Sequence, residues 1–263
     1  MAKKKEGYPN SDKLAKGIYS GIITPKNLPQ DIYYFNATQI KGAAEKALKI
    51  KFSEIDYNTP NFRKVEACRV NIWKFSAAKA FHQTLSMSDA LIENNKIVPF
   101  DVFKDKVAEL NIKFNKTWLE TEYNTAYGQS QMIEQWSRFE EQADILPYLQ
   151  YVTGSGEATC DICAPCDGVI LPVDDDFWNT NSVLQHFNCA CMIIQEDENA
   201  KQTSRKEANR ISEEISPLKH GMFMSNSGKS GIIFNKDTPY FNVPKQYKDF
   251  AERNFNLPIP KKN

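Results

Sequence analysis

The sequence predicts an α+β chain, with a helical N-terminal half of long antiparallel helices followed by a small β-rich lobe and an irregular C-terminal extension. Three observations predict this fold. Apolar and aromatic residues recur every three or four positions up to Pro147. Short β-branched and aromatic runs follow that proline, close to a cluster of cysteines. The last part of the chain is rich in Gly, Asn, Lys and Pro, which disfavour long regular elements.

The composition is that of a globular protein. The chain has 263 residues, 41% of them hydrophobic, which is enough for a substantial core. Its 33 basic and 33 acidic side chains cancel, so no chain-wide field attracts nucleic acid or anionic membranes. No apolar run approaches the roughly 18 residues of a bilayer-spanning helix, and the first residues lack the apolar core of a signal peptide. We expect no membrane partner, and folding in the cytoplasm, where cysteines stay reduced.

Four regions are expected along the chain. Closely spaced prolines and glycines indicate an extended N-terminal arm over residues 1–36. Residues 37–147 form the helical region and residues 148–196 the small β lobe. Residues 197–263 form a helix followed by a tail of extended strands or ordered loop, with one short helix near residues 247–253. Nine basic and four acidic residues fall within the first 50. The arm is therefore either a solvated tail or a weak contact to DNA.

Three helices are predicted in the helical region. The first covers residues 37–50, and the second runs from 61 to between 82 and 87. An aromatic stripe then predicts a long third helix from about residue 100 toward Pro147, interrupted at Gly128. Such a stripe is typical of core packing between antiparallel helices rather than of a cofactor site.

Three short strands are expected in the β lobe, at residues 148–153, 168–173 and 192–194. A sheet of this size has little core of its own. The acidic run Asp174–Asp176 is interpreted as a turn or helix cap, because three successive side chains diverge and rarely converge on one ion.

The cysteine cluster has metal-ligand spacing. Its pattern is Cys160-x2-Cys163-x2-Cys166, followed after a gap by His186-x2-Cys189-x-Cys191. Two ligands separated by two residues can reach one ion from a tight turn, and two such pairs complete a tetrahedral shell. A closed set of three Cys and one His suits zinc and leaves no open position for catalysis. The pattern therefore predicts a structural zinc ion that staples the β lobe.

The cluster offers more candidates than a four-coordinate ion needs. Cys166 precedes an Asp-Gly turn and is expected to be packed rather than ligating. Cys189 and Cys191 would point to opposite sides of an extended segment, so only one should face the ion. Cys68 and His82 lie on the second predicted helix and are expected to be core or boundary residues. The expected ligands are Cys160, Cys163, His186 and Cys189, with Cys191 as a substitute. Free buried thiols without metal are the alternative.

Several sequence motifs between about residues 60 and 195 occur in the same order as in a known protein family. They are Trp118–Tyr127, Tyr148–Thr153, Cys160-x2-Cys163-x3-Asp167-Gly168, Leu171–Trp178 and Asn188–Cys191. Together they resemble the phage Mu F-like minor head proteins of the phage head morphogenesis family. The family's Cys-x2-Cys corresponds to Cys160 and Cys163, and its His-x2-Cys-Arg-Cys ending to His186, Cys189 and Cys191. Ala190 stands where the family has Arg.

The resemblance implies a minor capsid or head-morphogenesis protein of a tailed phage, and not an enzyme. It implies a role in procapsid assembly and contact with the portal protein, the major capsid protein or both. The protein would be assembled in the host cytoplasm and reside in the virion head. Other members lack the first cysteine pair, so the fold in general does not require a metal.

A phage enzyme or toxin, a nuclease or transferase using the C-terminal region, is one alternative. From Gly221 to Gly228 there are six intervening residues where a phosphate-binding loop has four, and no clear strand precedes them. His220 has no Ser, Cys or paired carboxylate at a recognisable spacing. A zinc nuclease would need a second histidine near His186, and the other two histidines lie far from it in the sequence.

A zinc-ribbon nucleic-acid-binding protein is the other alternative. Such modules surround their metal with Lys and Arg, whereas residues 148–196 contain neither and hold several Asp and Glu. We therefore predict that this region has no salt-sensitive affinity for DNA in a gel-shift assay. A complex of residues 148–196 with DNA that weakens as salt rises would overturn the prediction.

Overall fold

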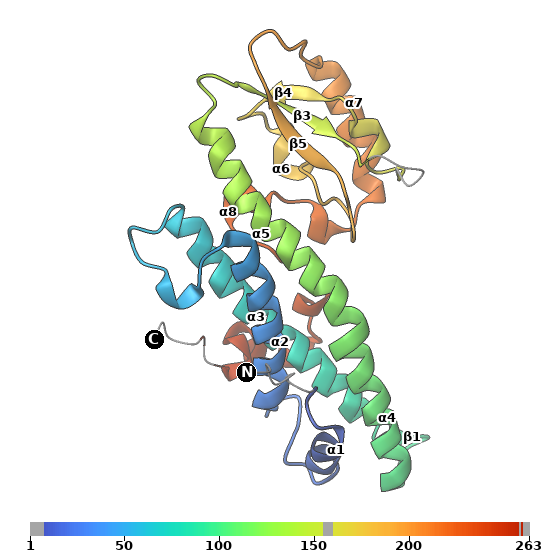
Figure 1. Cartoon of the computed structure of the whole chain (residues 1–263). Coiled ribbons are helices and arrows are strands. Elements are labelled where there is room, and N and C mark those ends of the chain that lie inside the picture. The colour runs from blue at the N-terminus through green and yellow to red at the C-terminus, as the bar shows by residue number, and fades with distance from the viewer. Residues whose placement is uncertain (1–7, 155–159, 258, 260–263) are drawn as a thin grey trace.

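A bundle of long helices carries a smaller α/β lobe at one end, and helix α1 lies at the opposite end (Figure 1). The computed structural model describes residues 8–154, 160–257 and 259. The bundle contains α1 (Ser11–Tyr19), α2 (Gln30–Leu48), η1 (Phe52–Glu54), α3 (Phe62–Asp89), α4 (Phe100–Ile112), η2 (Lys113–Trp118) and α5 (Leu119–Glu141). None of the helices within the described residues is long and apolar enough to cross a membrane. The predicted α+β class is confirmed.

The beginning of the described chain is helical, which corrects the extended arm expected over residues 1–36. Helix α1 starts after Asn10, whose side chain accepts a hydrogen bond from the Lys13 amide at 2.9 Å. Its apolar face, which includes Leu14 and Ile18, is buried in the bundle core. Capping and burial outweigh the closely spaced glycines and prolines there. Residues 1–7 of the expected arm lie outside the described residues.

The first two predicted helices exist, with different boundaries. Helix α2 starts directly after its N-cap residue Pro29, earlier than residue 37, because Ile32 and Tyr33 in its first turns are buried in the bundle. It ends where Lys49 adopts a left-handed conformation, with φ of 56°. The second prediction is confirmed by α3, which covers Phe62–Asp89.

The third predicted helix runs on without a break at Gly128. The helical path passes from α4 through the π-helical turn η2 into α5, and it ends at Glu141, before Pro147. Gly128 serves close packing instead, because an added Cβ would lie 2.9 Å from a methyl carbon of Leu184 in the lobe. The expected interruption is wrong because the glycine is required for a tertiary contact and does not reflect a local preference against helix.

A small hairpin between α3 and α4 was not predicted. Strand β1 (Ile92–Glu93) pairs antiparallel with β2 (Lys96–Ile97). Asn94 and Asn95 form the turn with φ of 51° and 58°, the left-handed values that a type I′ turn needs. The Asn-Asn pair between apolar residues is the signal that indicates such a turn. The hairpin leaves the cross-strand partners Ile92 and Ile97 exposed, at 61% and 67%.

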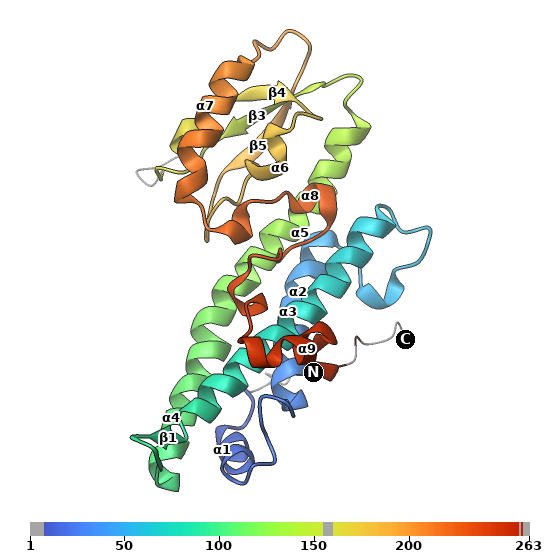
Figure 2. The same ribbon diagram turned by 180° about the vertical axis from the view of Figure 1, so that it is seen from behind.

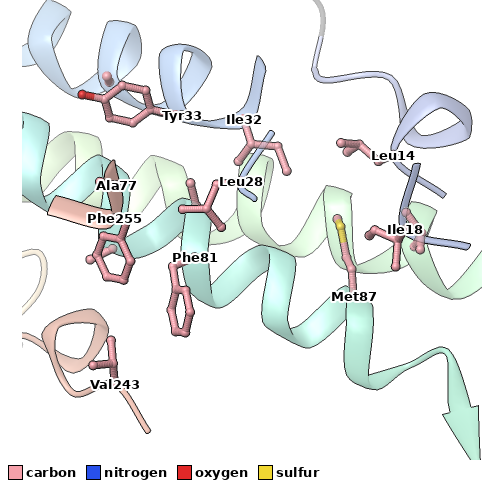
Figure 3. Close-up of a cluster of buried hydrophobic side chains, with 14 of the residues drawn as sticks. Leu14, Ile18, Leu28, Ile32, Tyr33, Ala77, Phe81, Met87, Val243 and Phe255 are labelled. Atoms are coloured by element: carbon pink, nitrogen blue, oxygen red, sulfur yellow. The ribbon is translucent and has the colours of Figure 1, made fainter. Parts of the chain in front are cut away.

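The C-terminal segment packs along the bundle. The helix expected at the start of residues 197–263 is confirmed by α7 (Arg205–Ile215), and the short helix expected near residues 247–253 by α9 (Lys248–Glu252), whereas the rest of the tail is not extended. It consists of short helical turns: η5 (Gly221–Phe223), α8 (Ser227–Ser230), η6 (Pro239–Phe241), η7 (Lys245–Tyr247), α9 (Lys248–Glu252) and η8 (Asn254–Asn256). Val243 and Phe255 share a buried cluster with Phe81 of α3 and Leu28 (Figure 3). Figure 2 shows this segment descending from the lobe along the bundle.

One asparagine holds the backbone of this segment. The Asn71 carbonyl oxygen accepts from the amides of Ile233 and Phe234 at 3.1 and 2.8 Å, and its amide nitrogen donates to the Phe234 carbonyl at 2.8 Å. The Phe234 ring stacks on Phe75 with centroids 3.6 Å apart. Asn71 thus supplies the backbone partners that a neighbouring strand would otherwise provide.

The lobe is a three-stranded antiparallel sheet in the order β4-β3-β5, covered by helices. Its elements are β3 (Tyr148–Val152), η3 (Ala164–Cys166), β4 (Ile170–Pro172), α6 (Phe177–Thr180), β5 (Met192–Glu196), α7 (Arg205–Ile215) and η4 (Ser216–Leu218). All three predicted strands exist. In register, Leu149 of β3 faces Leu171 of β4 and Gln195 of β5.

The lobe has a core of its own, contrary to the expectation that its sheet would bury little. Inward-facing side chains of the sheet, including Leu149 and Ile193, pack with Trp178 of α6 and Ile211 of α7. Trp136 of α5 completes this cluster and is fully buried. Hydrophobic burial therefore stabilises the lobe independently of any metal.

A buried ion pair ties α3 to α5. The Lys79 ammonium is fully buried and contacts the Glu122 carboxylate, which also accepts from the Tyr240 hydroxyl at 2.9 Å. Burial lowers the pKa of Lys79 and raises the pKa of Glu122, while their mutual attraction opposes both shifts. Each group thus depends on the other to remain charged in the core.

Removing one partner should therefore cost more than replacing both. We expect Lys79→Met to lower the free energy of unfolding by about 3–5 kcal/mol, because it leaves a carboxylate unpaired in the core. The double variant Lys79→Met, Glu122→Gln should lose less, since the new amide still accepts from Tyr240. Urea denaturation followed by circular dichroism measures both. Equal losses in the single and double variants would contradict this account.

Candidate metal centre

Two loops of the lobe bring the ligand candidates together. The first joins β3 to β4, and tight turns coil it: the amides of Cys163 and Ala164 both donate to the Cys160 carbonyl, at 3.0 and 2.9 Å. The second joins α6 to β5, and Asn188 adopts a left-handed conformation there, with φ of 58°. Chain reversal in both loops turns side chains of nearby residues toward one point.

The candidate ligand atoms form two groups that share the sulfur of Cys163. In one group, ligand atoms of Cys160, Cys163 and His186 all lie within 4.8 Å of one another. In the other, the sulfurs of Cys163, Cys189 and Cys191 do so. The Cys163 and Cys189 sulfurs are 3.8 Å apart. A tetrahedral ion with Zn–S bonds of about 2.3 Å also separates two sulfurs by about 3.8 Å, so this pair has the spacing of a metal site.

All four expected ligands thus gather around Cys163, and the substitute Cys191 joins them. The expectation that only one of Cys189 and Cys191 can face the site is wrong. It assumed an extended segment, whereas the chain turns at His186–Asn188 and strand β5 begins only at Met192. Five candidates therefore surround the site where a tetrahedral ion takes four.

The other two cysteines lie outside both groups. Cys166 is buried, and its sulfur accepts from the Gln185 side chain at 3.5 Å. Cys68 is buried in the bundle with its sulfur 3.9 Å from the Ser130 hydroxyl. Burial raises the pKa of Cys166 to about 11 and that of Cys68 to about 12. Both behave as packed thiols, as the sequence predicts.

The ring orientation of His186 suits a metal ligand. Its Nδ1 lies 2.8 Å from the Phe187 carbonyl oxygen. A carbonyl can only accept, so this contact places the proton of a neutral ring on Nδ1 and leaves a lone pair on Nε2. An outer hydrogen bond of this kind is what orients histidine ligands in metal sites.

Ionisation of one crowded sulfur opposes ionisation of the next. Hydrogen bonding with the Cys189 and Cys191 sulfurs, together with burial, raises the pKa of Cys163. Hydrogen bonds from Cys163 and Cys189 lower the pKa of Cys191, so negative charge at one sulfur disfavours it at the next. A divalent cation would relieve this conflict by stabilising every thiolate that it contacts. The donor set, soft thiolates with one imidazole, fits zinc.

Two further sequence features have packing roles. Asp175 accepts from the Phe177 amide at 2.8 Å and pairs with Arg205, so of the two roles predicted for the acidic run, a turn or a helix cap, the structure shows the turn; the N-cap residue Asp176 makes no side-chain capping hydrogen bond. Gly228 lies against Trp136, where an added Cβ would be 2.6 Å from the tryptophan Cβ. The Gly-Lys-Ser segment is thus a packed turn and does not form a phosphate-binding loop.

Residues 93–194 match the family described as Phage Mu protein F like protein. The match begins in the hairpin, includes α4 and α5, and ends in β5, so it contains every candidate ligand. It confirms the resemblance seen in the sequence, over a shorter span than the expected 60–195, because α3 lies outside it. No curated protein and no solved structure matches the chain. The family points to phage head morphogenesis.

Removal of the shared sulfur should abolish metal binding. We expect the purified full chain to carry about one metal ion, and Cys163→Ser to lose it, because both ligand groups contain this sulfur. Elemental analysis measures the metal content. Cys68→Ser is the matched control, since it alters an equally buried thiol far from the site and should keep the ion. Metal retained by Cys163→Ser would refute the assignment.

Proposed function

Since residues 93–194 are a phage Mu F-like segment, we propose that the protein is a minor capsid protein of a tailed phage, present in the virion head and active in procapsid assembly. The family match is the observation that carries this proposal. It covers the α4–α5 rod and the part of the lobe up to residue 194, and it leaves out α7. Assembly would take place in the host cytoplasm.

The portal protein is the proposed first partner, with the major capsid protein as a second. The hairpin supports a protein contact, because Ile92 and Ile97 pair across the strands and both side chains are exposed. Adjacent exposed apolar residues on an otherwise polar surface are typical of protein interfaces. Figure 1 shows the hairpin at the end of the bundle remote from the lobe, where a partner can reach it.

Zinc is the proposed ion of the cysteine cluster, and its role is structural. Cys160, Cys163, His186 and Cys189 are the proposed ligands, and Cys191 is close enough to replace one of them. The ion would link the β3–β4 loop to the α6–β5 loop. Zinc peptides gain about 10–16 kcal/mol from such binding, but here the lobe already has an apolar core, so the ion would chiefly fix the two loops.

Catalysis is not part of the proposal, because a closed four-ligand shell offers no position for substrate. The proposed function includes, as a minor element, a weak contact to DNA through the basic N-terminal part. Within the described residues, Lys13 of that part already pairs with Asp31 at 2.6 Å, which reduces the charge it can offer to phosphate.

The portal contact is tested by coexpressing the full chain with the portal protein of the same phage. We expect a complex in native mass spectrometry, and the chain in purified virions at few copies. The variant Ile92→Lys, Ile97→Lys should weaken the complex by on the order of tenfold or more, because it places charge in the proposed interface. Ile145→Lys alters an isoleucine of 78% exposure far from the hairpin and should leave the complex intact.

Failure of the wild-type chain to bind either the portal or the major capsid protein, together with its absence from virions, would refute the proposed function. If Ile145→Lys weakened the complex equally, the hairpin would not be the contact surface for the portal protein.

A further inference from the structure

Lys219, which follows η4 in the C-terminal segment, is a buried cation without a carboxylate partner. Its ammonium donates to the Thr180 carbonyl at 2.6 Å, the Asn181 side chain at 2.7 Å and the Gln185 side chain at 3.1 Å. These three neutral acceptors use all three of its protons. Among the residues that the structure describes, no Asp or Glu pairs with it. A buried ammonium needs negative charge nearby to remain favourable.

A chain of hydrogen bonds leads from Lys219 to the metal site. Gln185 accepts from Lys219 with its carbonyl oxygen, and its amide nitrogen donates to the Tyr151 hydroxyl at 3.1 Å. Tyr151 then donates its own proton to the Cys163 sulfur at 3.5 Å. At each step of this series, the group nearer to Lys219 donates its proton to the group nearer to Cys163. The series is therefore polarised so that Cys163, its last acceptor, carries negative charge.

The metal site would supply the missing charge. A zinc ion with three thiolates and one histidine has a net charge of −1, and with four thiolates −2. Burial lowers the pKa of Lys219 to about 8, while the sulfurs of Cys166 and Cys163 act to raise it. An anionic centre at the end of the hydrogen-bond chain favours the charged lysine, and the charged lysine favours the thiolates.

A second contact links the same two parts of the chain. Phe187, which follows the candidate ligand His186, packs edge-on against Phe223 of the C-terminal segment, with ring centroids 4.9 Å apart. Movement of the ligand loop would therefore disturb the segment at two places, one polar and one apolar.

We propose that Lys219 is the counter-cation of the metal–thiolate centre, so that metal binding and docking of the C-terminal segment on the lobe stabilise each other. The inference rests on the metal site of the proposed function. By linkage, any loss of metal affinity on removing the lysine charge is matched by an equal loss of segment docking on removing the metal. Lys219 acts here as a positioning residue, since it does not contact the ion.

Zinc affinity of the full chain tests the proposal, measured by competition with a chromophoric chelator over a range of pH. We expect Lys219→Met to weaken zinc binding by up to roughly 10-fold, the lower end of the effect usual for direct outer-shell partners, because Gln185 and Tyr151 lie between Lys219 and the Cys163 sulfur. The pH of half-maximal binding should rise, because thiolates form less readily without the cation. Lys219→Arg keeps the charge and should recover part of the affinity.

Lys229→Met is the matched control. Lys229 lies in the same segment, and its ammonium donates to a neutral group of α6, the Asn179 side chain at 2.7 Å, but it has no contact with Gln185. Its loss should leave zinc affinity and the pH midpoint unchanged. Tyr151→Phe breaks the chain at another link and should also raise the pH midpoint, which keeps the proposal testable if Lys219→Met fails to fold.

Hydrogen exchange gives the reciprocal measurement. Removing zinc with a chelator should speed amide exchange in residues 219–230 of the wild-type chain, and less so in Lys219→Met. A wild-type chain that binds no zinc would refute the metal site and this inference together. Zinc bound with equal affinity and equal pH dependence by wild type and Lys219→Met would refute the inference alone.

Discussion

Helix α5 is the element on which both halves of the structure depend, because it buries two faces in two different cores. Ala126 and Ile133 belong to the bundle core, whereas Met132 and Trp136 belong to the core of the lobe. Neighbouring positions on one helix point to different sides, so a single rigid rod fixes the lobe relative to the bundle. A bend at Gly128 would destroy that relation, which gives a physical reason for an unbroken helix there.

Because the lobe has an apolar core, a metal ion bound there would have a different structural role from the ion of a small zinc domain. In a small zinc domain the ion replaces a missing core and decides whether the chain folds at all. Here Trp178, Ile193 and their neighbours already bury a continuous cluster, and the candidate ligands lie on loops beside it. An ion bound there would then hold irregular backbone in one arrangement. This agrees with a family resemblance in which some members lack the first cysteine pair.

Much of the fold could be predicted from periodicity, and two of the misses share one cause. Helix α3 and the three strands follow from local patterns of apolar residues, as does the gathering of Cys160 and Cys163 by a tight turn. The expected break at Gly128 and the extended C-terminal tail were wrong because contacts with Leu184 and with α3 override local propensity. The separation of Cys189 from Cys191 was wrong for another reason: it assumed an extended segment, whereas these residues are irregular and strand β5 begins only at Met192.

The C-terminal segment shows why such contacts escape a reading of the sequence. It has no apolar periodicity to mark its path, and polar side chains anchor it to helices distant in the sequence. Asn71 of α3 bonds the amides of Ile233 and Phe234, and the Ser227 hydroxyl of the segment donates to the Gln129 carbonyl of α5 at 2.9 Å. Lys219 belongs to the same class of anchor, but its charge makes it different. A neutral anchor is satisfied by hydrogen bonds alone, whereas a buried ammonium also requires negative charge, and the sulfurs around Cys163 are the groups at the end of its hydrogen-bond chain that can supply it. On the proposed role of Lys219, the order of the segment would depend on the charge of a cluster contributed by two other loops.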